Sequence, residues 1–135
     1  MISRPTARTL SRVLASSSRQ FHATATGRQH ILDASPERFT QAVSGSKTVL
    51  VDFYADWCGP CRALTPLLKQ LVKPESEKFD LMTVNTDDQQ ELAMKYKIRA
   101  LPTVVAFRNG EPVGQFTGAL PAPRVQAFLE EISGR

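Results

Sequence analysis

The stretch VDFYADWCGPCRALTP, from Val51 to Pro66, places both cysteines of the chain where an apolar run gives way to a helical pattern. The run at 48–54 is rich in β-branched and aromatic side chains and predicts a buried central strand. From Cys58 onward, leucine and valine recur at helical spacing and predict a helix. Pro66 lies inside that pattern and is expected to kink the helix without ending it. A strand that leads directly into a helix favours folds in which helices pack on a sheet.

The rest of the chain alternates between strand and helix patterns. Ser35 and Pro36 predict the N-cap and first residue of a helix, Asp87-Asp88 resembles the cap of another, and Asn109-Gly110 predicts a hairpin turn. The predicted strands cover 30–34, 48–54, 79–85, 103–108 and 111–118, and the predicted helices 35–43, 58–72, 87–97 and 121–132. The order β-α-β-α-β-α-β-β-α predicts an α/β fold, a central mixed β-sheet flanked by helices on both faces.

Residues 1–28 differ in composition from the rest. They contain five Arg, five Ser and four Thr, and no Asp, Glu or Lys. On a helical wheel four of the arginines fall on one side, and apolar residues fall on the other. This pattern is typical of a mitochondrial transit peptide, so we expect residues 1–28 to be a disordered, cleaved leader and residues 29–135 to form one domain. The alternative is a basic tail that binds anionic surfaces.

Cleavage would change the charge of the chain. The stretch RQFHATATGR resembles a two-step processing site, with cuts before Phe21 and after Arg28, although a single cut near Phe21 also fits. The chain carries 17 basic and 13 acidic residues; the leader holds five of the basic ones, which leaves 12 basic and 13 acidic residues from Gln29 onward. The basic character thus belongs to the leader and indicates no nucleic-acid surface. The apolar runs are too short to span a bilayer, so no membrane contact is expected.

Three kinds of chemistry fit a Cys-x-x-Cys pair. A structural disulfide stabilises most when it closes a long loop, and a bridge from Cys58 to Cys61 closes a very short one. A structural zinc site needs about four Cys or His ligands, and the only histidines, His22 and His30, lie in or just after the leader. Both interpretations stay open as minor alternatives. Reversible redox chemistry is favoured, and no metal is expected.

The two cysteines are predicted to differ in reactivity. Cys58 begins the helix, where free N–H groups and the positive end of the helix dipole favour a thiolate. Cys61 lies one turn inside and is expected to be more buried. Cys58 is therefore the predicted nucleophile, and Cys61 the resolving cysteine that releases the reduced partner. Gly59 leaves the approach to the thiolate open, and Pro60 stiffens the short loop.

WCGPC in this context resembles the active site of the thioredoxin family. Further matches are RALPT at 99–103, FRNGE at 107–111 and VGQFTGAL at 113–120, and the resemblance covers about residues 30–133. It implies the thioredoxin fold and a protein-disulfide reductase that maintains thiol redox balance. It also implies a monomer with no bound cofactor. Electrons would come from NADPH through a separate flavoprotein, thioredoxin reductase, and pass to disulfide-containing proteins such as peroxiredoxins. With the leader, the implied location is the mitochondrial matrix.

The resemblance also implies roles for residues around the pair. Trp57 resembles an indole that shields the cysteines and borders the docking surface. Asp52 resembles a buried carboxylate that accepts the proton of Cys61, and a charge inside a core strand needs a reason of this kind. Tuning or docking roles are implied for Gly59, Pro60, Leu101, Pro102, Gly118 and Ala119, with Pro102 as a cis-proline. A purely structural role stays open for each of these residues. Trp57 could be a core residue, Asp52 could face outward, Pro102 could be a trans turn proline, and Gly118-Ala119 could be a plain strand-to-helix loop.

One position departs from the family pattern. Many thioredoxins place a lysine on the third strand near the buried aspartate, and the matching position here is Thr83. Asp52 is therefore expected to lack a cationic neighbour, so that burial raises its pKa with less opposition. Two other functions remain open, a non-catalytic binding module of the same fold and a protein disulfide oxidase or isomerase. Gly-Pro between the cysteines resembles the reducing end of the family.

Overall fold

The computed structural model describes residues 30–135, so the predicted leader at 1–28 lies outside the described residues. Within this range the elements follow the predicted order β-α-β-α-β-α-β-β-α. The strands are β1 (His30–Ile31), β2 (Thr48–Tyr54), β3 (Phe79–Asn85), β4 (Thr103–Arg108) and β5 (Glu111–Thr117). The helices are α1 (Pro36–Val43), α2 (Gly59–Leu71), α3 (Gln90–Lys95) and α4 (Ala122–Ser133).

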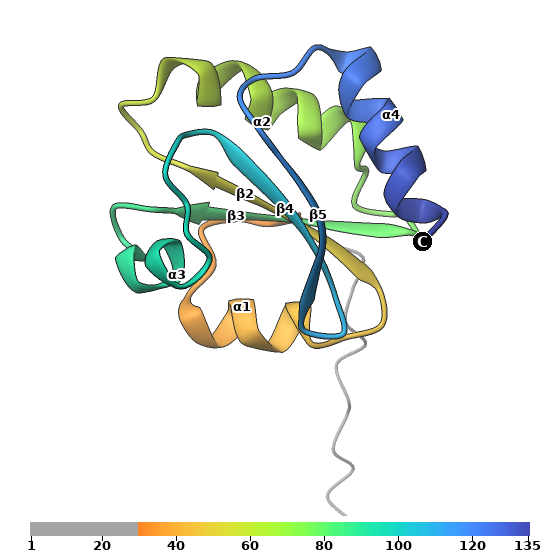
Figure 1. Cartoon of the computed structure of the whole chain (residues 1–135), viewed down its shortest axis with the longest axis horizontal. Helices are drawn as coiled ribbons and strands as arrows, with labels where there is room; N and C mark the ends of the chain where they lie inside the picture. Colours follow the sequence, from red (N-terminus) through yellow and green to blue (C-terminus); the bar gives the residue numbers. More distant parts are fainter. Residues whose placement is uncertain (1–29) are drawn as a thin grey trace, which may run out of the picture.

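The strands form one mixed sheet in the order β1-β3-β2-β4-β5 (Figure 1). β1, β3 and β2 are parallel, whereas β4 runs antiparallel to β2 and to β5. β2 lies in the middle and is buried over almost its whole length, which explains the nearly unbroken apolar run at 48–54. β1 is shorter than the predicted strand at 30–34: its pairing with β3 ends at Ile31, and Asp33 adopts a left-handed backbone with a φ of 50° that breaks the extended conformation.

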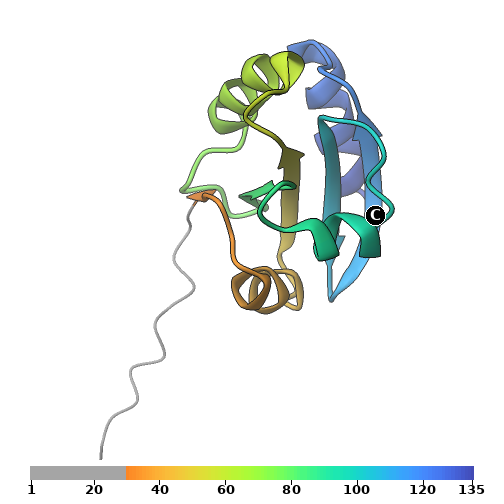
Figure 2. The same ribbon diagram turned by 90° about the vertical axis from the view of Figure 1, so that its left-hand side faces the viewer.

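Helices cover both faces of the sheet, as the sequence predicts (Figures 1 and 2). α1 and α3 form one layer, and α2 and α4 form the other. The first layer buries Phe39, Val43 and Leu92, and the second buries Leu64, Leu68, Val125, Leu129 and Ile132. None of the described helices is long and apolar enough to cross a membrane.

The alternation of side chains along β2 decides which helix each residue meets. Successive side chains of a strand point to opposite faces of the sheet. Val51 and Phe53 belong to the core beneath α1, whereas Leu50 belongs to the core beneath α2. Asp52, two residues after Leu50, therefore faces α2, the helix that starts at the cysteines.

The helix boundaries agree with the sequence at α1 and α2 and differ at α3. Ser35 caps α1 and Pro36 opens it, and α2 continues through Pro66, as predicted. α3 starts at Gln90 with no side-chain cap bond at its N-cap position, residue 89. The prediction that Asp87-Asp88 caps this helix is therefore wrong: the N-cap position is residue 89, and the Asp87 carboxylate accepts the Trp57 indole N–H instead.

The hairpin between β4 and β5 turns at Asn109 and Gly110, as predicted. Their φ values are 52° and 79°, the left-handed backbone that a two-residue hairpin needs and that Asn-Gly adopts readily. The N–H groups of Asn109 and Gly110 donate to the carbonyl oxygens of Gly45 and Val43, each at 2.8 Å. The turn is thereby attached to the end of α1.

Candidate active site

The two cysteines lie where β2 ends and the chain turns into α2. The N–H of Cys58 donates to the carbonyl oxygen of Ala55 at 3.1 Å and closes the turn. Cys58 is the N-cap of α2 and forms a disulfide with Cys61, with the two Cα atoms 5.4 Å apart. The predicted strand–turn–helix unit thus brings the pair together, and the structure holds it in the oxidised form.

The backbone at the start of α2 points at the first sulfur. The N–H of Cys61 donates to Sγ of Cys58 at 3.3 Å, and the helix dipole adds partial positive charge at the same end. Both effects would stabilise a thiolate on Cys58 and neither would help Cys61 comparably. Cys58 is 5% exposed and Cys61 is 2% exposed, so the predicted difference in burial exists but is small.

Asp52 is fully buried in the middle of β2, which excludes the outward-facing alternative. The hydroxyl of Thr65 on α2 donates to Oδ2 of Asp52 at 2.6 Å, whereas Oδ1 has no hydrogen-bond partner among residues 30–135. Burial raises the pKa of Asp52 to about 6, opposed by the Thr65 hydrogen bond and by the positive charge of Lys69. A carboxyl with this pKa changes charge near neutral pH, where a proton acceptor is most effective.

Thr83 occupies the strand position at which the sequence departs from the family pattern, in register with Asp52. Its hydroxyl accepts the N–H of Asp33 at 2.8 Å and lies 3.5 Å from the Asp33 carboxylate. The expectation that Asp52 lacks a cationic neighbour is nevertheless wrong, because Lys69 supplies positive charge from α2. Lys69 lies on a helix, whereas the lysine of the family pattern lies on the third strand.

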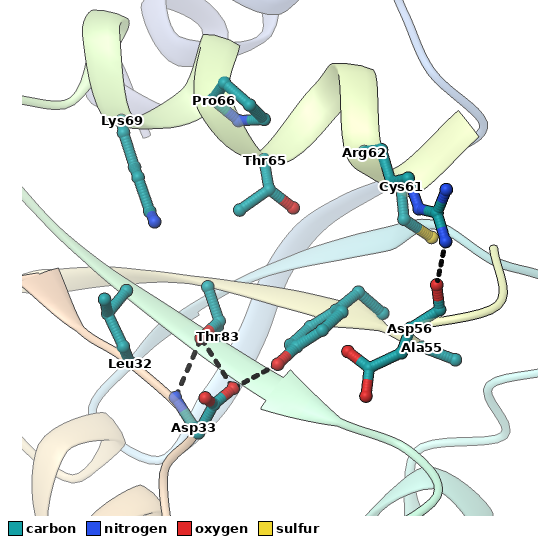
Figure 3. A pocket seen from close by; sticks show the side chains of 11 residues that line it. Leu32, Asp33, Ala55, Asp56, Cys61, Arg62, Thr65, Pro66, Lys69 and Thr83 are labelled. Carbon is teal, nitrogen blue, oxygen red and sulfur yellow. Dashed lines mark hydrogen bonds between the residues drawn. The ribbon is translucent and has the colours of Figure 1, made fainter. Parts of the chain in front are cut away.

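A pocket of about 340 Å³ lies beside α2, next to Cys61 and Thr65 (Figure 3). The hydroxyl of Tyr54 donates to the Asp33 carboxylate, and the Arg62 guanidinium donates to the carbonyl oxygen of Asp56 at 3.0 Å. Burial, followed by the bond to Asp33, raises the pKa of Tyr54, so this hydroxyl stays a neutral donor. The lining residues are Leu32, Asp33, Tyr54, Ala55, Asp56, Cys61, Arg62, Thr65, Pro66, Lys69 and Thr83.

The turn before β4 and the loop after β5 contribute the predicted docking residues. Leu101 packs against the small buried cluster that contains both cysteines, and the Leu101–Pro102 peptide bond is cis, as the resemblance implies. Gly118 donates its N–H to the carbonyl oxygen of Pro102 at 2.9 Å. Its φ of 93° is a conformation that favours glycine. The structure thus joins Gly118 to the proline turn, and Ala119 beside it is exposed.

Trp57 is 70% exposed, so it is not a core residue. Its indole N–H donates to Oδ2 of Asp87 at 3.0 Å. Gly59 and Pro60 form the exposed first turn of α2. A side chain at residue 59 would meet no atom within 4 Å, so the space beside the first cysteine is open to an approaching molecule.

The zinc interpretation of the cysteine pair requires further ligands close to it. Across residues 30–135, no three His, Cys, Asp or Glu side chains are grouped so that they could hold a metal ion. His30 contacts the carbonyl oxygen of Val72 through Nε2. His22, the other histidine that the zinc interpretation needed, lies outside the described residues.

A family match agrees with this geometry, in which a buried strand, a disulfide, a buried carboxylate and a cis-proline come together. The family model described as Thioredoxin matches residues 30–131. The chain belongs to the thioredoxin family. Family membership and the Cys58–Cys61 disulfide together identify this member of the family as a thiol-disulfide oxidoreductase with protein-disulfide reductase activity.

Individual thioredoxins resemble this family member over most of its described residues. The Caenorhabditis elegans protein named probable thioredoxin-2 is 44% identical over 99 residues, which are 73% of this chain and 68% of that protein. The mitochondrial thioredoxin of Mus musculus is 37% identical over 99 residues, 73% of this chain and 60% of the mouse protein. The crystal structure of Malassezia sympodialis thioredoxin has a TM-score of 0.70 at 33% identity, covering 77% of this chain and 93% of that one. The predicted thioredoxin fold is thereby confirmed.

Sequence reasoning did not single out Thr65, Lys69 or Asp33. For the first two a signal existed, because they follow Cys61 by four and eight residues in a predicted helix and so share its face. The contacts of Asp33 with Thr83 and Tyr54 depend on how the chain leaves β1, and no local pattern predicts them.

Proposed function

We propose that Cys58 attacks substrate disulfides and that Cys61 resolves the product. The Cys58 thiolate attacks one sulfur of the substrate and forms a mixed disulfide, and the other substrate sulfur leaves as a thiolate and takes up a proton. Cys61 then loses its proton and attacks Sγ of Cys58, which releases the second substrate sulfur and regenerates the Cys58–Cys61 disulfide. The assignment of Cys58 as the nucleophile rests on the hydrogen bond from the Cys61 N–H to Sγ of Cys58. This N–H lies in the first turn of α2, where it would stabilise a thiolate on Cys58.

We propose that Asp52 accepts the proton of Cys61. Its burial on the side of β2 that faces α2, and its contact with Thr65 one helix turn after Cys61, support this role. With a pKa of about 6, the carboxyl is mostly ionised at neutral pH and still basic enough to take up a proton.

Substrate docking is proposed to use the exposed surface around the disulfide. The exposed indole of Trp57 and the packing of Leu101 against the cysteine cluster support this site. The hydrogen bond between Gly118 and Pro102 also supports this site, because it joins the loop after β5 to the proline turn before β4. The proposed docking and tuning residues are Trp57, Gly59, Pro60, Leu101, Pro102, Gly118 and Ala119.

The disulfide must be reduced again after each cycle, because every turnover oxidises the cysteine pair. We propose that the electrons come from NADPH through a separate flavoprotein, thioredoxin reductase, with no cofactor bound to this chain. The proposed substrates are disulfide-containing proteins such as peroxiredoxins, and the chain is proposed to act as a monomer. Membership of the thioredoxin family supports these assignments.

We propose that residues 1–28 direct the chain to the mitochondrial matrix and are then removed, leaving a domain at 29–135. The Arg-rich, Ser-rich and acid-free composition of the leader supports this proposal. So do the start of the family match at residue 30 and the similarity to a mitochondrial thioredoxin of mouse.

Reduction of insulin disulfides with thioredoxin reductase and NADPH tests the reaction. We expect the full chain and the form that begins at Gln29 to consume NADPH at similar rates, and Cys58→Ser to consume almost none. A binding module would keep its function in Cys58→Ser. An oxidase would form disulfides in reduced ribonuclease faster than it reduces insulin, and an isomerase would reactivate scrambled ribonuclease faster than it reduces insulin. Any of these results would contradict the proposed reductase cycle.

A further inference from the structure

One face of α2 carries three polar side chains toward the sheet. Cys61, Thr65 and Lys69 are spaced four residues apart, so they lie on one side of the helix, roughly 6 Å from each other along its axis. All three line the pocket, and Figure 3 shows Thr65 and Lys69 pointing from the helix toward the strands. In the reduced protein the row therefore presents a thiol, a hydroxyl and an ammonium group, in that order, on the side of the sheet that holds Asp52.

Thr65 is the residue of this row that touches Asp52. Its hydroxyl donates to Oδ2 at 2.6 Å, the short distance typical of a bond to an ionised carboxylate. A hydroxyl has one proton to donate, so this bond favours the charged form of Asp52 and occupies Oδ2. Oδ1 has no partner in the described part of the chain. It is therefore the oxygen left to receive a proton.

Lys69 adds positive charge at the far end of the row. Its side chain is half-buried and lines the same pocket. The Thr65 bond and the Lys69 charge are the two effects that oppose the burial of Asp52, with the bond the larger of them. Thr83, opposite Asp52 on β3, carries no charge. The groups that favour an ionised Asp52 thus come from the helix that carries the resolving cysteine.

Other titratable groups face the pocket from several elements. Asp33 comes from the segment after β1, Tyr54 from the end of β2, Asp56 from the turn before the cysteines, and Arg62 from α2. Asp33 and Tyr54 bond to each other, and Arg62 bonds to the Asp56 carbonyl. On the opposite neighbour strand, β4, the residue in register with Asp52 is the apolar Val104.

We propose that Thr65 and Lys69 are positioning residues for proton transfer: Thr65 holds the Asp52 carboxyl with Oδ1 free, and Lys69 stabilises its negative charge. The inference rests on the proposed role of Asp52 as the proton acceptor. In the resolving step the S–H proton of Cys61 passes to Oδ1 of Asp52 while its sulfur bonds to Sγ of Cys58. The bond between Cys58 and the substrate sulfur breaks, and its electron pair leaves with that sulfur.

Stopped-flow fluorescence of Trp57, the only tryptophan of the chain, tests the proposal across pH with the reduced full chain and a disulfide peptide. At saturating peptide the observed rate is that of the resolving step. We expect Thr65→Val to move the pH profile of this rate upward by about one unit. The rate then falls about twofold at pH 7 and about fivefold at pH 6, and matches the unsubstituted protein at pH 9. Thr65→Ser restores the profile.

Lys69→Met is expected to move the profile in the same direction by less, and Lys69→Arg to restore it. The matched controls remove the same groups elsewhere and leave the profile unchanged. They are Thr40→Val on α1, where the hydroxyl bonds the Pro36 carbonyl, and Lys73→Met beyond α2. The carboxyl carbon resonance of Asp52, titrated by NMR in the oxidised full chain, measures the shift independently of any rate.

The Asp52→Asn variant tests the role of Asp52 as proton acceptor separately from the positioning roles of Thr65 and Lys69. If Asp52→Asn changes the resolving profile and Thr65→Val does not, or if Thr65→Ser fails to restore it, the positioning role is overturned and Asp52 keeps its role. If the Asp52 resonance titrates in the Thr65→Val and Lys69→Met variants at the same pH as in the unsubstituted protein, the proposal is overturned too. If Asp52→Asn leaves the profile unchanged, Asp52 is not the proton acceptor, and the positioning roles of Thr65 and Lys69 are overturned with it.

Discussion

The indole N–H of Trp57 donates a hydrogen bond to the carboxylate of Asp87 at 3.0 Å, which links the turn before the cysteines to the segment after β3. Because the indole is 70% exposed, packing alone leaves it free to change rotamer. The contact with Asp87 favours one orientation beside the disulfide. A preformed apolar surface loses less side-chain freedom when a partner binds.

Asp87→Ala is expected to loosen Trp57. One exposed hydrogen bond contributes on the order of 1 kcal/mol, so we expect KM for insulin to rise about two- to fivefold while kcat changes little. The fluorescence anisotropy of Trp57 should fall in the same variant. Asp88→Ala, at the exposed neighbouring position, is the matched control and should change neither quantity. Unchanged anisotropy in Asp87→Ala would show that the bond does not orient the indole.

Cys61→Ser is expected to accumulate mixed disulfides with substrate proteins, because Cys58 can attack but nothing resolves the product. Cys58→Ser is expected to accumulate few, since Cys61 lacks the helix N-terminal groups that favour a thiolate. Non-reducing electrophoresis followed by mass spectrometry compares the two variants. Equal trapping by both would contradict the assignment of nucleophile and resolving cysteine.

The stability of the fold is expected to depend on the charge of Asp52. Burial raises its pKa from 3.8 to about 6 on folding, so between these values the folded chain holds a proton that the unfolded chain has released. The contribution of Asp52 to the free energy of unfolding is therefore largest below about pH 4 and falls as pH rises through 6, by about 3 kcal/mol in total.

Asp52→Asn removes this charge and is expected to raise the free energy of unfolding by about 1 to 3 kcal/mol at pH 7.5. At pH 4, where Asp52 is neutral in the folded protein, the two proteins should be about equally stable. Urea unfolding of the disulfide forms at both pH values measures the difference. Asp88→Asn controls for the loss of an exposed charge. A variant that is less stable than the original at pH 7.5 contradicts the argument.

Gly118→Ala is expected to cost about 1 to 2 kcal/mol, because a side chain at a φ of 93° is strained. Gly59→Ala is the matched comparison, since its Cβ would meet nothing within 4 Å, and its effect should stay within about 0.5 kcal/mol. Urea midpoints for the two variants decide the matter. Similar losses in both would mean that the backbone at Gly118 adapts without strain.

Deletion of residues 1–28 is expected to leave reductase activity in vitro intact and to abolish uptake by isolated mitochondria. The expectation follows from the leader composition and from the start of β1 at His30. Uptake of the full chain is followed by protease protection. A deleted form that fails to fold, or a full chain that enters chloroplasts instead, would contradict the transit-peptide prediction.

Local patterns were sufficient to predict most of the fold. Ser35-Pro36 marks the start of α1 and Asn109-Gly110 marks the hairpin, because a cap and a turn are set by a few adjacent residues. The length of β1 and the start of α3 were not predictable in this way, since they depend on pairing with β3 and on the path of the chain after it.

The active site divides along the same line. The cysteine pair and the buried Asp52 could be predicted, because their chemistry is unusual at those positions. The contacts that tune Asp52 could not, because the register of α2 over β2 decides that Thr65 bonds to it and that Lys69 lies nearby. That register results from how the whole layer of side chains packs.

The hairpin between β4 and β5 also affects one chemical degradation reaction of this chain, the deamidation of Asn109. An Asn-Gly pair deamidates when the backbone nitrogen of the glycine attacks the asparagine side chain and closes a succinimide ring. The nitrogen of Gly110 instead donates its N–H to the carbonyl oxygen of Val43 at 2.8 Å, which holds it against the end of α1. We therefore expect deamidation mainly in molecules whose turn has separated from α1. The rate at which a stored preparation accumulates aspartate at residue 109 thus reports how often the hairpin opens.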